Sequence, residues 1–535
     1  MMDWILEQFL GRKIEKETAR YLRELSLSPV LESRQQADGT LAAFRTEPGT
    51  KMTLGTTLWG EQVTVPLEEI IRAYGLITGG TGSGKTMFGL TILKSLIDLL
   101  PYGSTNGIGV IDAKGDLYRG ALYLLWQRLQ HLAQSDPKAC ESLRERVVIY
   151  DFSSRDPVSS YNILARWPEV EADYFALNRA DLLLDLLPGR DTLSLGGTAV
   201  LHKLLLLLSE FNLPVTYMSE VLHDESLRQR LVAQSQNDLL KRYFDRQFAR
   251  EPKPTIEAIA RRMEALFASE GVRLALSGTT APDFRQFQDA GRLVLVNVFG
   301  ETISRSVRRL LQGLVLSDIR ASVFTRKRKE RAFLWCCDEA QNFFATEKLR
   351  EHMADLLSMS RSFGTYFLYL TQNMSTAVQD PRITKVLTTN MRWSFSMRGD
   401  PSDCSFLKPV LPVTGRKPRP RTDPFSEVTF YSLAEERAMA LDEIAELSDR
   451  VGWFWIKARS AEPLKIRTQE LTIPECSELE RAVMSLSRDP AFGQRLSRTE
   501  YERLAAERDR QWAEEDDDLR AGLEETYQRG RGVAK

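Results

Sequence analysis

The sequence contains compact apolar runs. They are separated by segments whose apolar residues lie at helical spacing. The runs cover residues 74–78, 108–111, 147–150, 293–298, 332–337, 366–371 and 393–397. They lack the polar alternation of a half-exposed strand, which predicts strands covered on both faces. Residues 87–100 follow the first run with an apolar face at helical spacing. Strands alternating with helices predict an α/β fold with a mostly parallel sheet between helices.

The pattern changes in other parts of the chain. Residues 52–65 have a β-type composition, with Gly55 and Gly60 as turn positions, whereas helical periodicity dominates residues 168–285. Charged helix formers dominate after residue 471. These changes predict five parts: a helical lead-in at 1–45, the first part of the α/β domain at 46–167, an inserted all-α domain at 168–285, the second part at 286–471, and a charged helical tail at 472–535.

Composition narrows the class of protein. The chain has 43% hydrophobic and 27% charged residues and a formal net charge of −1. This composition is typical of a globular protein, and it lacks the global basic field of many small nucleic-acid binders, so any DNA contact must be local. The cysteines have no metal-ligand spacing, and the uncharged apolar runs fall short of the roughly 20 residues that span a bilayer. We therefore expect a cytoplasmic protein without a zinc site.

A glycine-rich motif follows the first predicted strand. It matches G-x-x-x-x-G-K-[ST] and consists of Gly79, Gly80, Thr81, Gly82, Ser83, Gly84, Lys85 and Thr86. Such a loop, at the start of a helix, directs backbone N–H groups at phosphates. Lys85 would reach the β- and γ-phosphates of ATP, and the Thr86 hydroxyl would bind Mg²⁺. The alternative is a glycine-rich turn followed by an unrelated Lys-Thr pair.

A second motif carries the carboxylates that hydrolysis requires. The apolar run at 332–337 ends in Asp338 and Glu339. Asp338 would hold the Mg²⁺ shell, and Glu339 would polarise the attacking water. Taken alone, the pair is also compatible with an ordinary strand exit capped by acids.

Two further residues complete the predicted catalytic set. Gln372 follows the run at 366–371, and ligand-contacting residues lie at the carboxyl ends of parallel strands. It would sense the γ-phosphate or orient the water. Arg361 precedes this strand and would reach the ATP of a neighbouring subunit. A solvated surface arginine is the alternative, and Arg392 and Arg398 are rival candidates for the role.

The order of these motifs resembles the type IV secretion and conjugation coupling proteins (VirD4/TraG/TraD-like), in the FtsK/HerA branch of P-loop motor ATPases. Residues 111–116, Ile-Asp-Ala-Lys-Gly-Asp, are similar to the D-x-K-G-[DE] motif of that family, and residues 161–164 to its Y-N-P-L, with Ile163 in place of proline. The glycine-rich motif at 79–86 corresponds to the P-loop of the family. The residues that lead into it, and the segments at 338–340, 360–364 and 371–372, are also similar to the family's motifs. The resemblance covers about residues 50–400.

This resemblance implies a RecA-like domain that binds ATP and Mg²⁺, carries an inserted all-α domain and assembles into a homo-hexameric ring that passes DNA. It also implies a relaxase or relaxosome as partner. Typical members begin with membrane-spanning helices, and no such segment is found here, so we expect a separate membrane subunit or a soluble branch of the family. The leading function is an ATP-driven DNA translocase of a conjugative or secretion system. The alternatives are a HerA-like DNA-processing or defence ATPase, and an ATP-gated adaptor that recruits proteins.

Three charged segments remain. Residues 326–331 and 416–421 are basic and would touch phosphate backbones, or would be solvated loops between buried elements. Residues 514–518 are acidic and would recruit a basic partner or serve as a solubilising tail.

Overall fold

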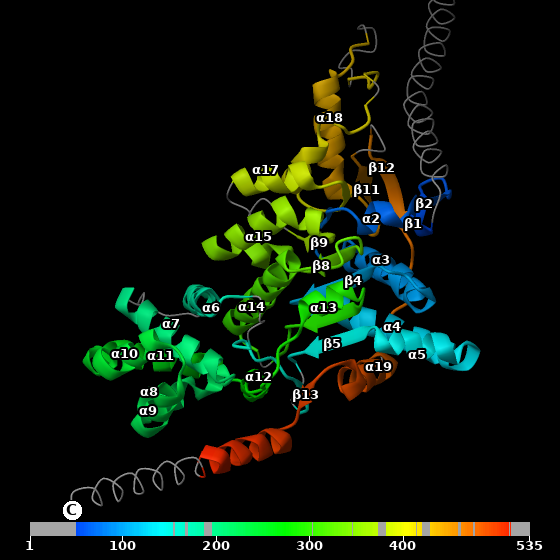
Figure 1. The fold of residues 1–535 in the computed structure, drawn as a ribbon. Coiled ribbons are helices and arrows are strands. Elements are labelled where there is room, and N and C mark those ends of the chain that lie inside the picture. Colours follow the sequence, from blue (N-terminus) through cyan, green and yellow to red (C-terminus); the bar gives the residue numbers. More distant parts are fainter. Residues whose placement is uncertain are drawn as a thin grey trace, which may run out of the picture. The chain divides into compact units, whose positions relative to one another are not determined.

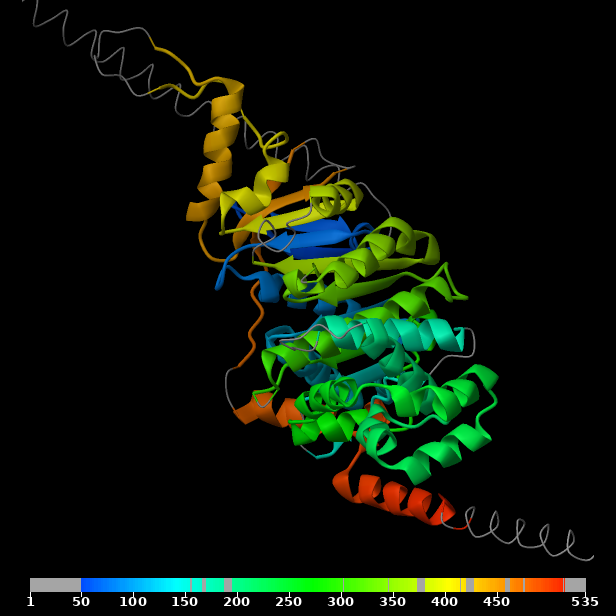
Figure 2. The ribbon, with the colours of Figure 1, turned by 90° about the vertical axis from the view of Figure 1, so that its left-hand side faces the viewer.

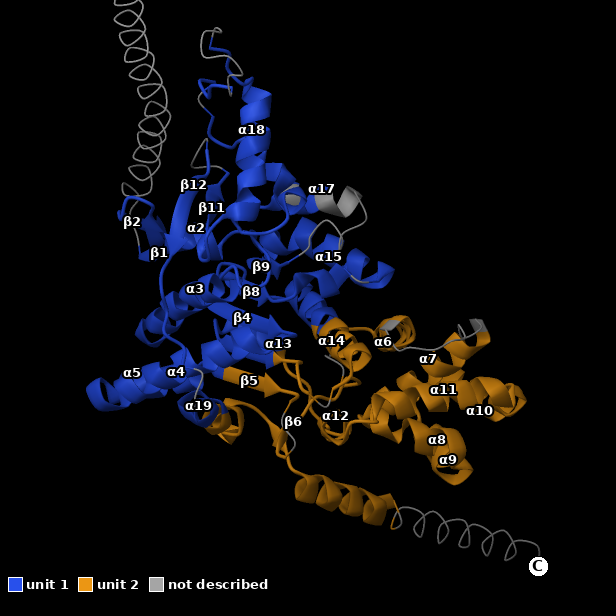
Figure 3. Cartoon of the chain, turned by 180° about the vertical axis from the view of Figure 1, so that it is seen from behind, with its two compact units in different colours: residues 1–147, 284–296, 316–483 blue, residues 148–283, 297–315, 484–535 orange. Residues whose placement is uncertain are grey.

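The structure is a computed structural model and describes residues 50–512 except 154–155, 166–169, 187–194, 302, 345, 373–380, 414, 420–427, 458–461, 475–476, together with residue 514. The chain divides into two compact units (Figure 3). Unit 1 comprises residues 1–147, 284–296 and 316–483, and unit 2 comprises residues 148–283, 297–315 and 484–535. The predicted lead-in at 1–45 and most of the acidic segment at 514–518 lie outside the described residues.

A large sheet forms the centre of unit 1 (Figure 1). Its strands run in the order β2-β1-β12-β11-β10-β3-β9-β8-β4-β7. Their bounds are β1 Lys51–Thr57, β2 Gln62–Pro66, β3 Gly75–Thr78, β4 Gly107–Asp112, β7 Leu293–Asn297, β8 Phe333–Cys337, β9 Thr365–Thr371, β10 Trp393–Met397, β11 Val451–Ile456 and β12 Leu464–Thr468. In β7, residues 293–296 belong to unit 1. The α/β fold predicted from the apolar runs is confirmed.

The sheet has a parallel and an antiparallel part. Strands β10, β3, β9, β8 and β4 pair in parallel, in that order. Every residue of β3, β4, β8, β9 and β10 is buried, as expected for strands with both faces covered. On the other side of β10, the strands β11, β12, β1 and β2 pair antiparallel. The hairpin β1–β2 matches the β-type stretch predicted at 52–65, whereas β11 and β12 were not predicted.

Helices lie on both sides of this sheet (Figure 2). Those of unit 1 are α2 Leu67–Ile71, α3 Lys85–Leu99, α4 Asp116–Ser135, α5 Pro137–Glu145, α13 Phe284–Asp289, α15 Glu347–Met359, α17 Pro381–Asn390 and α18 Leu433–Asp442, with parts of α14 Arg305–Phe324 and α19 Ser477–Ser487. Helix α3 directly follows the P-loop and packs against α4. The helix predicted at 87–100 is therefore confirmed, and its first residue is Lys85.

Unit 2 is mainly helical. Its helices include α6 Ala172–Leu186, α7 Leu195–Glu210, α8 Met218–His223, α9 Glu225–Gln234, α10 Asp238–Arg246, α11 Lys253–Leu266 and α12 Glu270–Leu276. The strand β5 spans Val147–Asp151, with residues 148–151 in this unit, and β6 (Val158–Ser159) pairs antiparallel with β13 (Arg495–Leu496). A last helix covers residues 498–512, and its Trp512 ring contacts Tyr217.

Among the helices that the structure describes, none is both long enough and apolar enough to span a membrane.

Candidate nucleotide-binding site

The strand register brings the predicted site residues to one edge of the sheet. Thr78, the last residue of β3, lies level with Thr371 of β9, and Cys337 of β8 lies level with Tyr369 of β9. Ile111 of β4 lies level with Cys337. The chain therefore leaves these four parallel strands at the same edge, where the P-loop, Gln372 and the Asp338–Glu339 pair follow their strands and Asp112 ends β4.

The P-loop is held in shape by its own backbone and by two loops beside it. The Ser83 hydroxyl donates to the Gly80 carbonyl (2.8 Å), the Gly80 N–H donates to the Arg398 carbonyl (2.6 Å), and the Arg450 N–H donates to the Ser83 carbonyl (2.8 Å). Gly84 precedes α3 with φ 107°, and a Cβ there would lie 3.0 Å from Met397 Cε. A side chain at residue 84 would be strained and crowded, so glycine is needed.

Lys85 is buried at the start of α3. Its ammonium donates to the carbonyls of Gly79 (2.6 Å) and Gly80 (2.9 Å). Burial lowers the pKa of Lys85, and the nearby carboxylates of Asp338 and Glu339 oppose that change. The lysine thus places a partly desolvated cation inside the loop, which fits a phosphate as partner.

Two buried aspartates lie at the ends of β4 and β8. Asp112 accepts three backbone N–H bonds, from Lys114, Gly115 and Tyr118, and so orders the turn into α4. Burial raises the pKa of Asp338 well above its usual value, and the charges of Asp112 and Glu339 add to that effect. A divalent cation would offset this cost, because it favours the charged carboxylates.

A chain of hydrogen bonds joins the P-loop to Glu339. The Thr81 hydroxyl donates to Gln372 Oε1 (3.0 Å), and Gln372 Nε2 donates to Glu339 Oε1 (2.9 Å). Gln341 Nε2 donates to the other Glu339 oxygen, and the Thr371 hydroxyl donates to Gln341 Oε1 (3.1 Å). Both carboxylate oxygens of Glu339 are thereby held by side-chain amides.

Sequence reasoning missed two residues of this region. Gln341 lies in η4 (Ala340–Phe344), directly after the acidic pair, and Arg450 lies before β11. Gln341 had a sequence signal, since it lies two residues beyond Glu339 at a strand end. Arg450 had no sequence signal. Its place beside the P-loop depends on the antiparallel strand β11, which begins more than 350 residues after the P-loop.

The three candidate arginines lie in different environments. Arg361 lies in η5 (Ser360–Phe363), before β9 begins, and is exposed. It is therefore at the edge of the sheet opposite the P-loop of the same chain. Arg392, which precedes β10, forms an ion pair with Glu69 (3.0 Å). Arg398 follows β10 beside the P-loop and forms an ion pair with Asp449 (2.7 Å).

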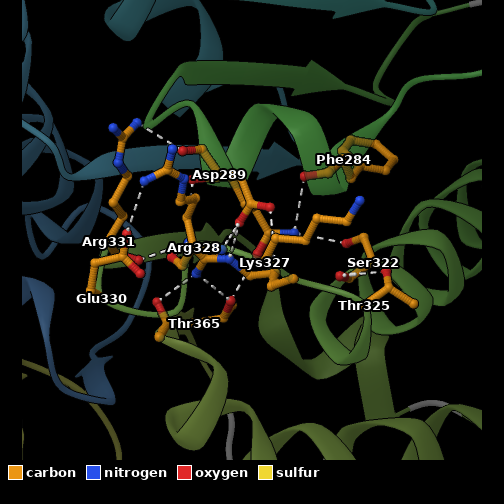
Figure 4. Close-up of polar contacts among 12 residues, drawn as sticks. Phe284, Asp289, Ser322, Thr325, Lys327, Arg328, Glu330, Arg331 and Thr365 are labelled. Atoms are coloured by element: carbon orange, nitrogen blue, oxygen red, sulfur yellow. Dashed lines mark hydrogen bonds and ion pairs between the residues drawn. The ribbon is translucent and has the colours of Figure 1, made fainter.

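The basic segment at 326–331 includes a buried structural arginine. Figure 4 shows Asp289 among the residues of this segment. The Arg326 side chain is 0% exposed, and its Nε lies 3.1 Å from Asp289 Oδ1. Backbone N–H groups of Lys327 and Arg328 also donate to the Asp289 carboxylate. Arg326 therefore serves the packing of this turn, whereas the Lys327 and Arg328 side chains are exposed.

The second basic segment is described only in part. Residues 420–421 lie outside the described residues. Arg419 donates to both carboxylate oxygens of Glu435 (2.8 Å each) and lies over the Tyr431 ring. At least this arginine is thus engaged within its own loop region.

The donor set fits a magnesium nucleotide. No cluster of three or more His, Cys, Asp or Glu side chains able to hold a metal occurs among the residues that the structure describes. Mg²⁺ in nucleotide sites needs no such cluster, because one or two protein ligands act together with phosphate oxygens and water. Asp338 and Thr86 would supply the protein ligands here.

No protein-family model and no curated protein matches the sequence. Among solved structures, VirB4 of Thermoanaerobacter pseudethanolicus is 14% identical, with a TM-score of 0.50, and the match covers 79% of this chain and 98% of that one. The plasmid coupling protein TrwB in complex with ADP and Mg²⁺ is 16% identical, with a TM-score of 0.49 and coverage of 85% and 95%. At such identities a likeness concerns fold rather than function. The chain has the P-loop NTPase fold, in an arrangement similar to that of VirB4.

Proposed function

We propose that this protein is an ATPase that moves DNA as a ring-shaped motor. The observation that carries the ATPase part is the hydrogen-bond chain from Thr81 through Gln372 to Glu339, at the strand edge that also holds Lys85 and Asp338. A phosphate-binding loop connected to a carboxylate that could activate water is the arrangement that hydrolysis needs.

Each residue has a role in this proposal. The P-loop amides and Lys85 hold the phosphates, and Thr86 and Asp338 hold Mg²⁺, which neutralises the charge that develops on the transferred phosphoryl group. Glu339 orients the attacking water and accepts its proton. Gln372 is bonded to both the P-loop and Glu339, so a change in the loop on nucleotide binding reaches the carboxylate directly.

The proposal that DNA is the substrate rests on the resemblance of the sequence motifs. The motif order resembles that of the coupling proteins, and the fold similarity to VirB4 agrees with a motor of that kind. From this resemblance we propose a homo-hexamer acting on DNA without sequence preference, with a relaxase and a separate membrane subunit as partners. Genes for a relaxase and a secretion channel beside this one would favour transfer, whereas a nuclease gene would favour the HerA-like function.

ATP turnover measured with and without single- and double-stranded DNA tests the proposal. We expect DNA to stimulate turnover, and binding to weaken steeply with salt because the contacts are to phosphates. Lys85→Ala should abolish turnover, whereas Lys94→Ala, on the same helix and paired with the half-exposed Asp98, should leave it unchanged. Turnover that DNA does not stimulate, together with no DNA binding at low salt, would reject the motor and favour the adaptor.

A further inference from the structure

A pocket of about 700 Å³ adjoins the P-loop within unit 1. Its lining comes from three parts of the chain: the first two turns of α3, the first two turns of α4, and residues within 471–474 and 477–480. The lining residues are Thr86, Met87, Leu90, Asp116, Arg119, Gly120, Leu471, Ile473, Leu479 and Glu480. The volume falls within the roughly 300–1,000 Å³ that is usual for small-molecule sites.

The pocket begins where a bound nucleotide would leave the P-loop. In such loops the lysine reaches the β- and γ-phosphates, and the backbone also cradles the α-phosphate. The nucleoside is attached to the α-phosphate, and it must extend away from Glu339 and Gln372, which take the γ-phosphate end. Thr86 and Met87 line the pocket and directly follow Lys85, so the pocket offers the nucleoside a place next to the loop.

The lining has the chemistry of a base site. Met87 and Leu90 lie on α3, one turn apart, while Ile473 and Leu479 come from the far end of the unit 1 sequence. Apolar side chains of this kind can enclose the faces of a planar base. The Arg119 guanidinium adds a flat cation that can stack on such a ring.

Several of the residues 473–483 that the structure describes are anchored beside this pocket. Leu479 and Ala482 of α19 form a buried cluster with Tyr123 of α4, and Ile473 and Val483 pack against it. Glu480 forms an ion pair with Arg119, and the Tyr123 hydroxyl donates to Glu478 (3.5 Å). Residues 478–480 are therefore held against α4 beside the pocket.

We infer that this pocket binds the base and ribose of the nucleotide, and that Leu471, Ile473, Leu479 and Glu480 form one wall of the site. This inference rests on the proposed ATPase function and extends it, because the P-loop itself recognises only phosphates. It assigns the start of the predicted charged tail to nucleotide recognition. Nucleotide binding would then involve Ile473 and Leu479 as well as Gln372.

Comparing MgATP with magnesium tripolyphosphate tests the inference, because tripolyphosphate has the phosphates without the nucleoside. Wild-type protein should bind MgATP more tightly, as measured by isothermal titration calorimetry. Ile473→Ala removes a pocket wall, and we expect it to weaken MgATP binding about tenfold, the usual size of a lost apolar contact in a pocket, without changing tripolyphosphate binding. Val483→Ala is the matched control, since Val483 packs on the same cluster but does not line the pocket.

The outcomes separate this inference from the proposed function. Equal affinity of wild-type protein for the two ligands, or an Ile473→Ala variant that binds MgATP as wild type does, would overturn the nucleoside site while DNA-stimulated turnover could still stand. If Val483→Ala weakened MgATP as strongly as Ile473→Ala, the effect would be one of packing, and the inference would fail. Binding of neither ligand by wild-type protein would reject the ATPase proposal, and the nucleoside site with it.

Discussion

Glu339 has an unusual backbone for a residue with a side chain. Its φ is 50°, in the left-handed region, where a non-glycine residue costs roughly 1–3 kcal/mol. The turn leads from β8 into η4 and leaves the carboxylate between Gln341 and Gln372. Strain of this kind persists only where surrounding contacts enforce it, and it is often found at functional sites.

We expect Glu339→Gln to bind MgATP with wild-type affinity and to hydrolyse it at least about a hundredfold more slowly, because an amide cannot accept the proton of the attacking water. Single-turnover kinetics and equilibrium binding measure the two effects separately. Glu351→Gln, an exposed change on α15, is the control. Wild-type turnover by Glu339→Gln would remove Glu339 from the catalytic set.

Gln341 lets the positioning of Glu339 be tested separately from its chemistry. Gln341→Ala removes one of the two amides that hold the carboxylate, and we expect kcat to fall about tenfold with KM unchanged, since a hydrogen bond to a charged group contributes roughly 1.5 kcal/mol. Asn342→Ala is the control, because Asn342 contacts the Glu339 carbonyl through its backbone N–H. An unchanged kcat in Gln341→Ala would mean that Gln372 alone positions the carboxylate.

Site residues that directly follow an apolar strand could be predicted from the sequence. Site residues that are placed by a turn or by a distant part of the chain could not. Gln372 was predicted because it follows an apolar run, and the register of β9 places it at the P-loop edge. Gln341 reaches Glu339 only through the turn of η4, which no periodicity announces. Ile473 and Arg450 lie near the P-loop because distant parts of the chain pack together. Short sequence motifs contain no information about such packing.

At the scale of elements, periodicity was reliable where burial is uniform. Strands buried on both faces give continuous apolar runs, so β4, β8, β9 and β10 were predicted to within about one residue. Strand β12 alternates buried and less buried residues, including an exposed Arg467, and it was missed. Charge runs were less informative, because the basic segment before β8 includes one arginine that is fully buried.

Arg326 connects the starts of β8 and β9. Its guanidinium donates to the carbonyls of Gly364 (2.8 Å) and Arg331 (2.8 Å), and it pairs with Asp289. Gly364 directly precedes β9, and Arg331 lies shortly before β8. Burial lowers the pKa of Arg326, and the hydrogen bond and charge of Asp289 oppose that change.

We expect Arg326→Ala to destabilise the protein by about 3 kcal/mol or more, because it leaves Asp289 and several carbonyls without their partner. Urea unfolding followed by circular dichroism measures the change. Arg328→Ala, with a largely exposed side chain, should have little effect on stability. Equal midpoints for the two variants would contradict the structural role of Arg326.

At the scale of the whole molecule, one residue of the proposed catalytic set lies away from the others. Lys85, Asp338, Glu339 and Gln372 follow the carboxyl ends of parallel strands, whereas Arg361 precedes β9 at the opposite edge. Strands of this length separate the two edges by roughly 15–20 Å. Arg361 therefore cannot reach the ATP of its own subunit, and its proposed role requires a second copy of the chain.

We therefore expect Arg361→Ala to bind MgATP normally and to lose DNA-stimulated turnover, because an arginine supplied by a neighbour contributes about 10³-fold or more to hydrolysis. Mixing tests the role directly. Adding subunits with Arg361→Ala should lower the activity of wild-type assemblies by more than the dilution of wild-type subunits explains. Mixing Arg361→Ala subunits with inactive Lys85→Ala subunits should restore activity, at interfaces where an intact P-loop meets an intact Arg361. Arg392→Ala, which breaks the pair with Glu69 at the same edge, is the control that should neither poison wild type nor complement Lys85→Ala. Activity of the mixtures that simply averages that of their components would return Arg361 to the solvated surface and remove the argument for a shared ATP site.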